Sequence, residues 1–322
     1  MSTPELKTRQ PSGKPSWPMI LLAGAEKTGK TYAAAALSAS DLVDRTFWIE
    51  VGEGSADLYG ALPGARYEIV EHDGSFNNLG LMTRLATEQP VEKKPHALVV
   101  DSMTAVWDML ADEQQLIANQ RAARKGRGGS GDATITMDQW NAAKKRWNRL
   151  LDVLRKHNGP VILIARLEQV AVVGPDGKPT TDKTWKIRAE KNLPFEVEAV
   201  VEMPRPREAY LTGVRSLRLE VPPGAHVPYS DFTLDGLLRD MGLGELETSP
   251  RAYVATDAEA YVASLAGPEH EQLRRDAQAS SGPVQRSRPK QPQSDEWSTA
   301  APAAQPGSGV REDGPADGGP EQ

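Results

Sequence analysis

Short apolar runs alternate with longer amphipathic or alanine-rich segments through most of this chain. Five runs have the length and composition of strands buried on both faces of a parallel sheet: 18–23, 46–51, 67–70, 97–101 and 160–165. The segments between them favour helices, at 31–40, 76–87, 104–124 and 137–156. Strands that alternate with helices predict the α/β class, with a mainly parallel sheet covered by helices on both faces.

The pattern changes after residue 165, where Gly and Pro turns separate shorter apolar stretches. We expect short strands at 185–188, 197–203, 209–212 and 216–221, and a short helix at 233–241. These strands predict an antiparallel β extension at the edge of the sheet.

Both ends of the chain lack apolar runs. Residues 1–16 and 281–322 bury too little apolar surface to offset their chain entropy, so we expect a disordered N-terminal arm and a disordered C-terminal tail. Between them the sequence predicts one core over 17–245 and a partly helical linker over 246–280.

A glycine-rich loop separates the first expected strand from the first expected helix. It reads Gly24-Ala25-Glu26-Lys27-Thr28-Gly29-Lys30-Thr31 and is followed by Tyr32. Glycine tolerates positive φ, so the backbone N–H groups of such a loop can point inward at phosphates, and the helix N-terminus adds the positive end of its dipole. Lys30 can reach the β and γ phosphates and Thr31 can hold Mg²⁺. The loop therefore predicts an ATP site with Mg²⁺ as cofactor, and includes Lys30 among the catalytic residues.

Asp101 ends the apolar strand Leu98-Val99-Val100-Asp101 and precedes Ser102. A carboxylate in this position holds Mg²⁺ through water in P-loop proteins, which makes Asp101 a metal residue together with Thr31. The alternative is that Asp101 only caps the following helix.

Two acids, Glu50 and Glu53, lie at or just after the end of the second expected strand. ATP hydrolysis needs a group that orients or deprotonates the attacking water, and a carboxylate can do this. Here the sequence resembles the RecA-like recombinase ATPases, whose second strand ends in a catalytic glutamate followed by an aspartate and a tyrosine at the adenine. With one inserted residue, Glu53, Asp57 and Tyr59 match these positions, and the resemblance implies those roles for them. Glu50 remains the alternative base. A third interpretation is that these acids are solvated loop charges.

A closer resemblance is to phage-encoded RecA-like ATPases, the core-only group that includes the Sak-type single-strand annealing proteins. It covers about residues 17–243 and consists of the phosphate loop near the N-terminus, the strand Leu-Val-Val-Asp-Ser, a long helical insert and a β-rich end. The resemblance implies a RecA-like P-loop fold and a homo-oligomer that acts on single-stranded DNA. Where such ATPases often carry a polar γ-phosphate sensor, this chain offers Arg166, Glu168 or Gln169.

Charge is unevenly distributed in this protein of net charge −6. Residues 121–149 hold eight Lys or Arg against two acids, and Arg124, Lys125 and Arg127 lie beside flexible glycines. Such a segment suits contact with a nucleic-acid backbone without base readout, so these three residues are candidate DNA contacts; the alternative is a solvated helix end and a plain linker. Trp140 and Trp147, seven residues apart, are expected on the core-facing side of one helix, with stacking on DNA as the alternative.

A second loop, 173–184, is rich in Gly, Pro, Asp and Lys and is followed by further basic residues. In related oligomeric ATPases, basic residues on this β-rich segment reach a neighbouring subunit's active site. The resemblance therefore implies Lys186, Arg188 and Lys191 as trans-acting fingers that neutralise transition-state charge. Exposed hairpin charges are the equal alternative.

These features lead to one main hypothesis, an ATPase that acts on single-stranded DNA in phage recombination, annealing or repair. The alternatives are a nucleotide-dependent assembly switch and a replicative helicase or its loader. A single-strand-binding protein or other recombination proteins are further expected partners. The chain has no cysteine, which excludes disulfides and thiolate metal sites, and no apolar signal core or membrane span, so we expect a cytoplasmic protein, in the host cytoplasm if phage-encoded.

Overall fold

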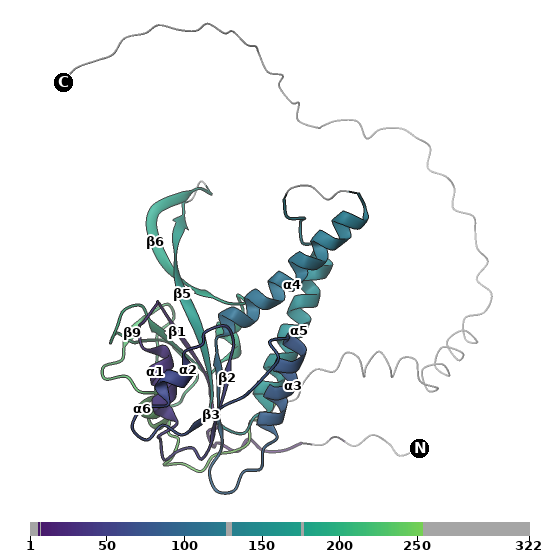
Figure 1. Ribbon diagram of the computed structural model, residues 1–322. Coiled ribbons are helices and arrows are strands. Elements are labelled where there is room, and N and C mark those ends of the chain that lie inside the picture. The colour runs from purple at the N-terminus through teal and green to yellow at the C-terminus, as the bar shows by residue number, and fades with distance from the viewer. Residues whose placement is uncertain (1–5, 7, 127–130, 175–176, 254–322) are drawn as a thin grey trace, which may run out of the picture. The chain divides into compact units, whose positions relative to one another are not determined.

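The computed structural model describes residues 6, 8–126, 131–174 and 177–253. The described part contains one sheet, in the order β3-β2-β4-β5-β1-β7-β8-β9, with β6 paired to β5 outside this path (Figure 1). Its strands are β1 Met19–Gly24, β2 Thr46–Glu50, β3 Tyr67–Ile69, β4 Ala97–Asp101, β5 Val161–Val173, β6 Pro179–Arg188, β7 Ala199–Met203, β8 Tyr210–Val214 and β9 Val227–Pro228.

The strands from β3 to β7 along this order run parallel, and β8 and β9 continue the sheet antiparallel. Parallel strands need crossover connections, which here are mostly helical. The helices are α1 Lys30–Leu37, α2 Ala56–Tyr59, α3 Phe76–Thr87, α4 Met103–Arg124, α5 Met137–Lys156 and α6 Leu234–Asp240, with a 3₁₀ turn at Leu193–Glu196. The predicted α/β class, the parallel sheet and its antiparallel extension are confirmed.

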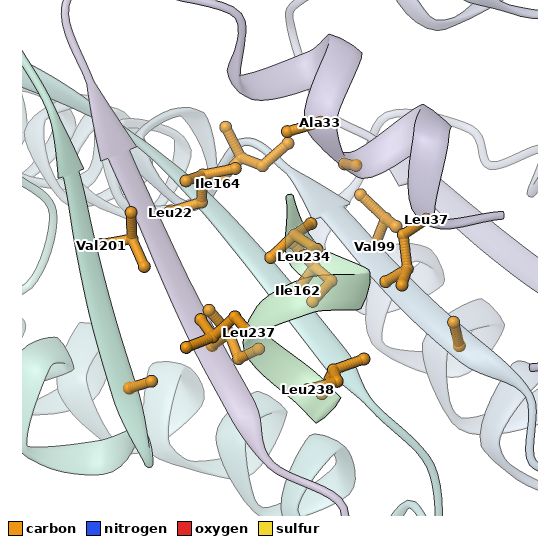
Figure 2. Packing of buried hydrophobic residues seen from close by; sticks show 14 of the residues in the cluster. Leu22, Ala33, Leu37, Val99, Ile162, Ile164, Val201, Leu234, Leu237 and Leu238 are labelled. Carbon is orange, nitrogen blue, oxygen red and sulfur yellow. The ribbon is translucent and has the colours of Figure 1, made fainter. Parts of the chain in front are cut away.

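Two apolar layers form the core because successive side chains of a strand point to opposite faces. On β1, Ile20 and Leu22 pack with α1 and α6, whereas Met19 and Leu21 pack on the face covered by α3, α4 and α5. Figure 2 shows the first layer, with leucines of α6 against β1 and β5. Every residue of β1 is buried, which explains why its sequence is continuously apolar.

Three elements differ from the sequence expectations. First, β5 and β6 are much longer than predicted and form a hairpin that extends beyond the parallel sheet (Figure 1). Second, the expected strand at 216–221 is wrong, because Ser216 Oγ accepts the backbone N–H groups of Arg218 and Leu219 and holds a local turn. Third, α2 was not among the helices expected from the sequence.

The predicted domain boundaries stay predictions, because the linker beyond residue 253 and the whole tail lie outside the described residues. Within the described part, Lys14 pairs with Glu247 and the backbone N–H of Ser249 donates to Pro15 O (2.9 Å). The stretches before and after the core therefore meet. No helix in the described ranges is long and apolar enough to cross a membrane.

Candidate nucleotide site

The glycine-rich loop lies between β1 and α1, where the carboxyl end of a central strand meets a helix N-terminus. Gly29 has φ 100° and Lys27 has φ 56°, so the loop uses the left-handed conformations that turn successive N–H groups inward. At Gly24 a Cβ atom would lie 2.5 Å from Thr28 Oγ1, so a larger residue would disrupt the turn. The loop thus has the backbone form of a phosphate-binding loop.

Lys30 begins α1, and its ammonium nitrogen lies inside the loop, where Nζ donates to Ala25 O (2.7 Å). Burial lowers the pKa of Lys30, an effect that the nearby carboxylates of Asp101 and Glu53 oppose. A partly desolvated ammonium has much to gain from phosphate oxygens, because they replace the lost hydration.

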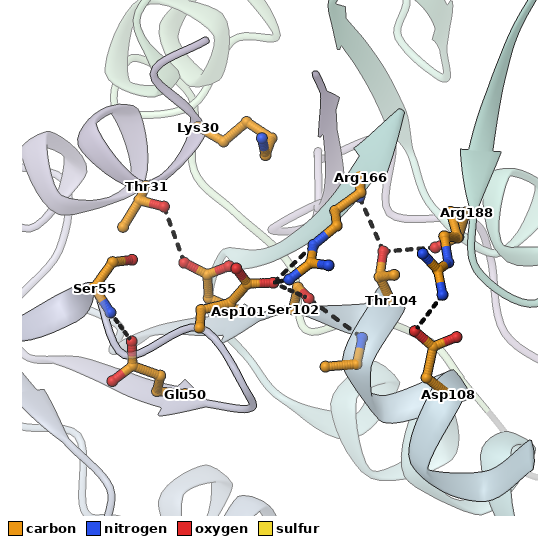
Figure 3. Close-up of polar contacts among 12 residues, drawn as sticks. Lys30, Thr31, Glu50, Ser55, Asp101, Ser102, Thr104, Asp108, Arg166 and Arg188 are labelled. Atoms are coloured by element: carbon orange, nitrogen blue, oxygen red, sulfur yellow. Dashed lines mark hydrogen bonds and ion pairs between the residues drawn. The ribbon is translucent and has the colours of Figure 1, made fainter. Parts of the chain in front are cut away.

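Thr31 and Asp101 meet at the bottom of the loop, where Thr31 Oγ1 donates to Asp101 Oδ2 (3.1 Å; Figure 3). Asp101 is 2% exposed, and its burial, followed by the charge of Glu53, raises its pKa to about 6. Buried carboxylates need a cation or hydrogen-bond donors, and a hydroxyl and a carboxylate are hard oxygen ligands of the kind Mg²⁺ takes beside nucleotide phosphates. The residues present therefore fit Mg²⁺. The helix-cap alternative for Asp101 is wrong, because Ser102 is the N-cap of α4 and accepts the N–H of Ala105.

Glu53 lies close to Asp101 and is fixed by two partners. Ser102 Oγ donates to Glu53 Oε1 (2.7 Å), and Arg166 donates to the same oxygen from Nη2 (2.9 Å) and Nε (3.2 Å). Within the described residues no hydrogen bond reaches Oε2 of Glu53. The second carboxylate oxygen is thus available to a water molecule.

Glu50, the alternative base, has a different environment. Its Oε1 accepts the backbone N–H groups of Ser55 (2.6 Å) and Ala56 (3.0 Å) at the start of α2. Two charge-assisted bonds to backbone donors fix the loop after β2. This position gives Glu50 a structural role and favours Glu53 at the water.

Two of the predicted nucleotide contacts are aromatic residues that contact each other. Tyr32 on α1 and Tyr59 on α2 form an edge-to-face pair with ring centroids 6.3 Å apart, and Tyr32 is 52% exposed. Asp57 is exposed on the first turn of α2. Glu26 and Lys27 lie at the loop tip, where their exposed side chains pair with each other (3.1 Å).

The three sensor candidates separate in space. Arg166 is the last residue of β5 that pairs with β1, opposite Gly24, and its guanidinium reaches Glu53. Glu168 and Gln169 lie beyond it on the hairpin, opposite Lys186 and Trp185. Of these three, Arg166 forms an ion pair with a candidate residue of the nucleotide site.

The candidate DNA contacts lie at the far end of the helical pair α4 and α5 (Figure 1). Arg124 ends α4 and Lys125 follows it, both exposed, while Arg127 lies outside the described residues. Trp147 is 1% exposed and packs edge-on against Trp107, and Trp140 stacks on Trp107 from the same helix. The prediction that the two α5 tryptophans are core residues is confirmed for Trp147, and Trp140 is half-buried.

The predicted trans-acting fingers lie on and after β6. Lys186 and Lys191 are exposed. Arg188 is different, because its Nη2 donates to Asp108 Oδ2 on α4 (3.0 Å). An ion pair within its own chain occupies Arg188.

Sequence reasoning missed the partners of Glu53, namely Ser102 and Arg166, and the role of Thr104 described below. The signal for Ser102 was its position directly after Asp101. Arg166 appeared only as a sensor candidate, because its pairing needs the relative placement of β2 and β5, which are separated by β4.

The protein-family model described as "AAA domain" matches residues 17–224 of this chain. The chain belongs to this AAA domain family. The match includes the phosphate loop, Asp101, Glu53 and the whole β5–β6 hairpin, and the family relationship accounts for a nucleotide site at the loop. No curated protein matches the chain.

Solved structures that are similar to this chain have low sequence identity and low TM-scores. One is a RadB recombinase, with 19% identity and a TM-score of 0.40 over 74% of this chain and 93% of the other. Another is an ATPase of a bacterial type III secretion system, with 13% identity and a TM-score of 0.34 over 58% of this chain and 52% of the other. At these values neither likeness bears on function.

Proposed function

We propose that this AAA-family protein is a RecA-like, Mg²⁺-dependent ATPase that acts on single-stranded DNA in phage recombination, annealing or repair. The observation that carries the ATPase part is the contact of Thr31 with Asp101 beside the half-buried Lys30. It brings the hydroxyl and the ammonium group of two α1 residues to the carboxylate at the end of β4. ATP–Mg²⁺ needs these three groups together.

In this proposal Lys30 binds the β and γ phosphates, and Thr31 and Asp101 hold the metal ion, which neutralises phosphate charge. Glu53 orients the attacking water with its second carboxylate oxygen. Tyr32, Tyr59 and Asp57 lie on the side of the loop where the nucleoside would rest. Hydrogen bonds already hold Lys30, Thr31, Asp101 and Glu53 in these positions.

Two projections support the DNA part of the proposal. The α4–α5 pair follows the end of β4, the β5–β6 hairpin continues β5, and both extend beyond the carboxyl edge of the sheet (Figure 1). Arg124 and Lys125 are exposed on one projection and Lys183 and Lys186 on the other. Phosphate contacts of this kind give affinity without base readout. A homo-oligomer would place Lys186 or Lys191 of one subunit near the phosphates of the next.

The test is ATP hydrolysis by the purified protein with Mg²⁺, with and without single-stranded DNA, beside the Lys30→Ala variant. Hydrolysis that needs Lys30 and rises with DNA supports the whole proposal. Hydrolysis that DNA leaves unchanged would favour the nucleotide-dependent assembly switch, which predicts an ATP-dependent change of oligomer size instead. Strand separation of a duplex would favour a helicase.

A further inference from the structure

Thr104 joins the candidate nucleotide site to the base of the β5–β6 hairpin. It lies on the first turn of α4, three residues after Asp101, and is 1% exposed. Thr104 Oγ1 accepts the backbone N–H of Arg166 (2.9 Å) and donates to the carbonyl oxygen of Arg188 (2.5 Å; Figure 3). One buried hydroxyl thus binds the backbone of both hairpin strands.

The place at which Thr104 binds is special within the sheet. Arg166 and Arg188 are the first facing pair of the hairpin, and Arg166 is also the last residue of β5 that pairs with β1. At this residue the pairing of β5 with β1 ends and its pairing with β6 begins. The Thr104 hydroxyl therefore fixes the backbone where the hairpin emerges from the sheet.

The side chain of Arg166 continues from this fixed point to Glu53. Its Nε and Nη2 both donate to Oε1, and a planar guanidinium sets the direction of a carboxylate as well as its distance. The loop of Glu53 constrains it less, because Gly52 and Gly54 flank it with φ 70° and 65° and glycine is conformationally permissive. Side-chain bonds must therefore hold the carboxylate in place.

We propose that Thr104 is a positioning residue for hydrolysis, whose hydroxyl holds the hairpin base where Arg166 can orient Glu53. The inference rests on the role of Glu53 in the proposed function. This contact of Arg166 with Glu53 would also couple the hairpin to Glu53, because a ligand that moves the base of β5 and β6 would move Arg166.

The test uses the pair Thr104→Val and Thr104→Ser in the full-length protein. Valine keeps the shape of threonine and removes the hydroxyl, whereas serine keeps the hydroxyl. We expect Thr104→Val to lower kcat for ATP by about 10-fold to 10²-fold with KM almost unchanged, because misplacement of a reacting group by about 1 Å has effects of this size. Thr104→Ser should restore most of kcat. Thermal melts show which temperature keeps every variant folded during the assay.

Asp108→Asn is the matched control. It breaks a second contact between α4 and β6, the exposed ion pair with Arg188, without touching the backbone of Arg166. Exposed pairs contribute little, so kcat should stay close to the wild-type value. An equal loss in Asp108→Asn and Thr104→Val would mean general loosening of the hairpin and would overturn the specific role of the hydroxyl.

A double variant separates this inference from the proposed function. If Thr104 acts through Glu53, the variant Thr104→Val/Glu53→Gln should hydrolyse ATP no more slowly than Glu53→Gln alone. Additive losses would show that Thr104 acts elsewhere. A loss in Glu53→Gln with normal kcat in Thr104→Val would overturn the inference alone. Normal kcat in Glu53→Gln would refute the role of Glu53 and the inference with it.

Discussion

We predict that the free energy of unfolding of this protein falls in mild acid because His157 is buried. It follows α5 as its C-cap residue and is 3% exposed, and its Nε2 lies 2.7 Å from the carbonyl oxygen of His96. Burial lowers the pKa of His157 to about 4, with smaller contributions of the same sign from Arg251 and His96, against the hydrogen bond to His96 O, which raises it. The folded protein therefore holds His157 neutral, with Nε2–H as the donor.

The size of the effect follows from the gap between the folded and unfolded pKa values. In the unfolded chain a histidine titrates near pH 6.5, so below that pH the unfolded state binds a proton that the folded state refuses until about pH 4. The stabilisation is fully present above pH 6.5 and is lost as the pH falls towards 4. At about 1.4 kcal/mol per pKa unit the total is about 3 kcal/mol, of which about 2 kcal/mol is lost by pH 5.

The assay is urea unfolding at pH 7 and pH 5 of the wild type and of His157→Gln, whose amide can still donate to His96 O but cannot titrate. The free energy of unfolding of the wild type should fall between these pH values by about 2 kcal/mol more than that of the variant. His226→Gln, which replaces an exposed histidine, should follow the wild type. Equal pH dependence in the wild type and His157→Gln would refute the reasoning.

Four further predictions concern function and the chain ends. Lys30→Ala should abolish hydrolysis and strongly weaken ATP binding in a nucleotide-binding assay; undiminished turnover would refute the phosphate-loop assignment. Glu53→Gln should keep ATP affinity and lower turnover about 10²-fold, the scale of general-base loss, and more than Glu50→Gln does; the reverse order would assign the base to Glu50. Changing Arg124, Lys125 and Arg127 together to Ala should weaken single-strand binding for all base compositions and reduce the slope of log affinity against log salt by about 0.7 per lost phosphate contact. An unaltered slope would return this segment to the plain-linker interpretation. Deleting 281–322 should leave the unfolding midpoint and basal hydrolysis almost unchanged; a large drop would show that the tail docks on the core.

Local sequence signals predicted most of the parallel sheet. Runs such as 18–23 and 97–101 are apolar because both faces of β1 and β4 are buried, and the phosphate loop carries its own glycine code. The wrong strand predictions arise because a short stretch of sequence does not show which strand it pairs with. The length of β6 depends on its pairing with β5, since its own residues are mostly exposed and polar. The segment 216–221 alternates like a strand, but the side chain of Ser216 holds its start in a local turn.

Some residues of the candidate site could also be predicted from the local sequence, and others could not. Lys30, Thr31 and Asp101 were predictable because each acts from a fixed place in a short motif. The choice between Glu50 and Glu53 was not, because both follow β2 and only the fold shows that Glu50 binds the backbone at α2 while Glu53 faces Arg166. Contacts between distant segments decide the roles of equivalent side chains.

The balance of charge in the site bears on the proposed oligomer. Lys30 and Arg166 offset Asp101 and Glu53, so these four groups sum to zero before nucleotide binds, whereas Mg²⁺–ATP brings a net charge of about −2 and the transition state spreads it over the γ oxygens. Arg166 is committed to Glu53 and Arg188 to Asp108. Both arginines are therefore already paired, and we propose that a further cation for the γ phosphate comes from a neighbouring subunit. Lys186 and Lys191, exposed on and after β6, are suited to that role. If they act in trans, a mixture of Lys30→Ala subunits with Lys186→Ala/Lys191→Ala subunits should regain hydrolysis that neither variant shows alone. No recovery in mixed oligomers would refute the action in trans.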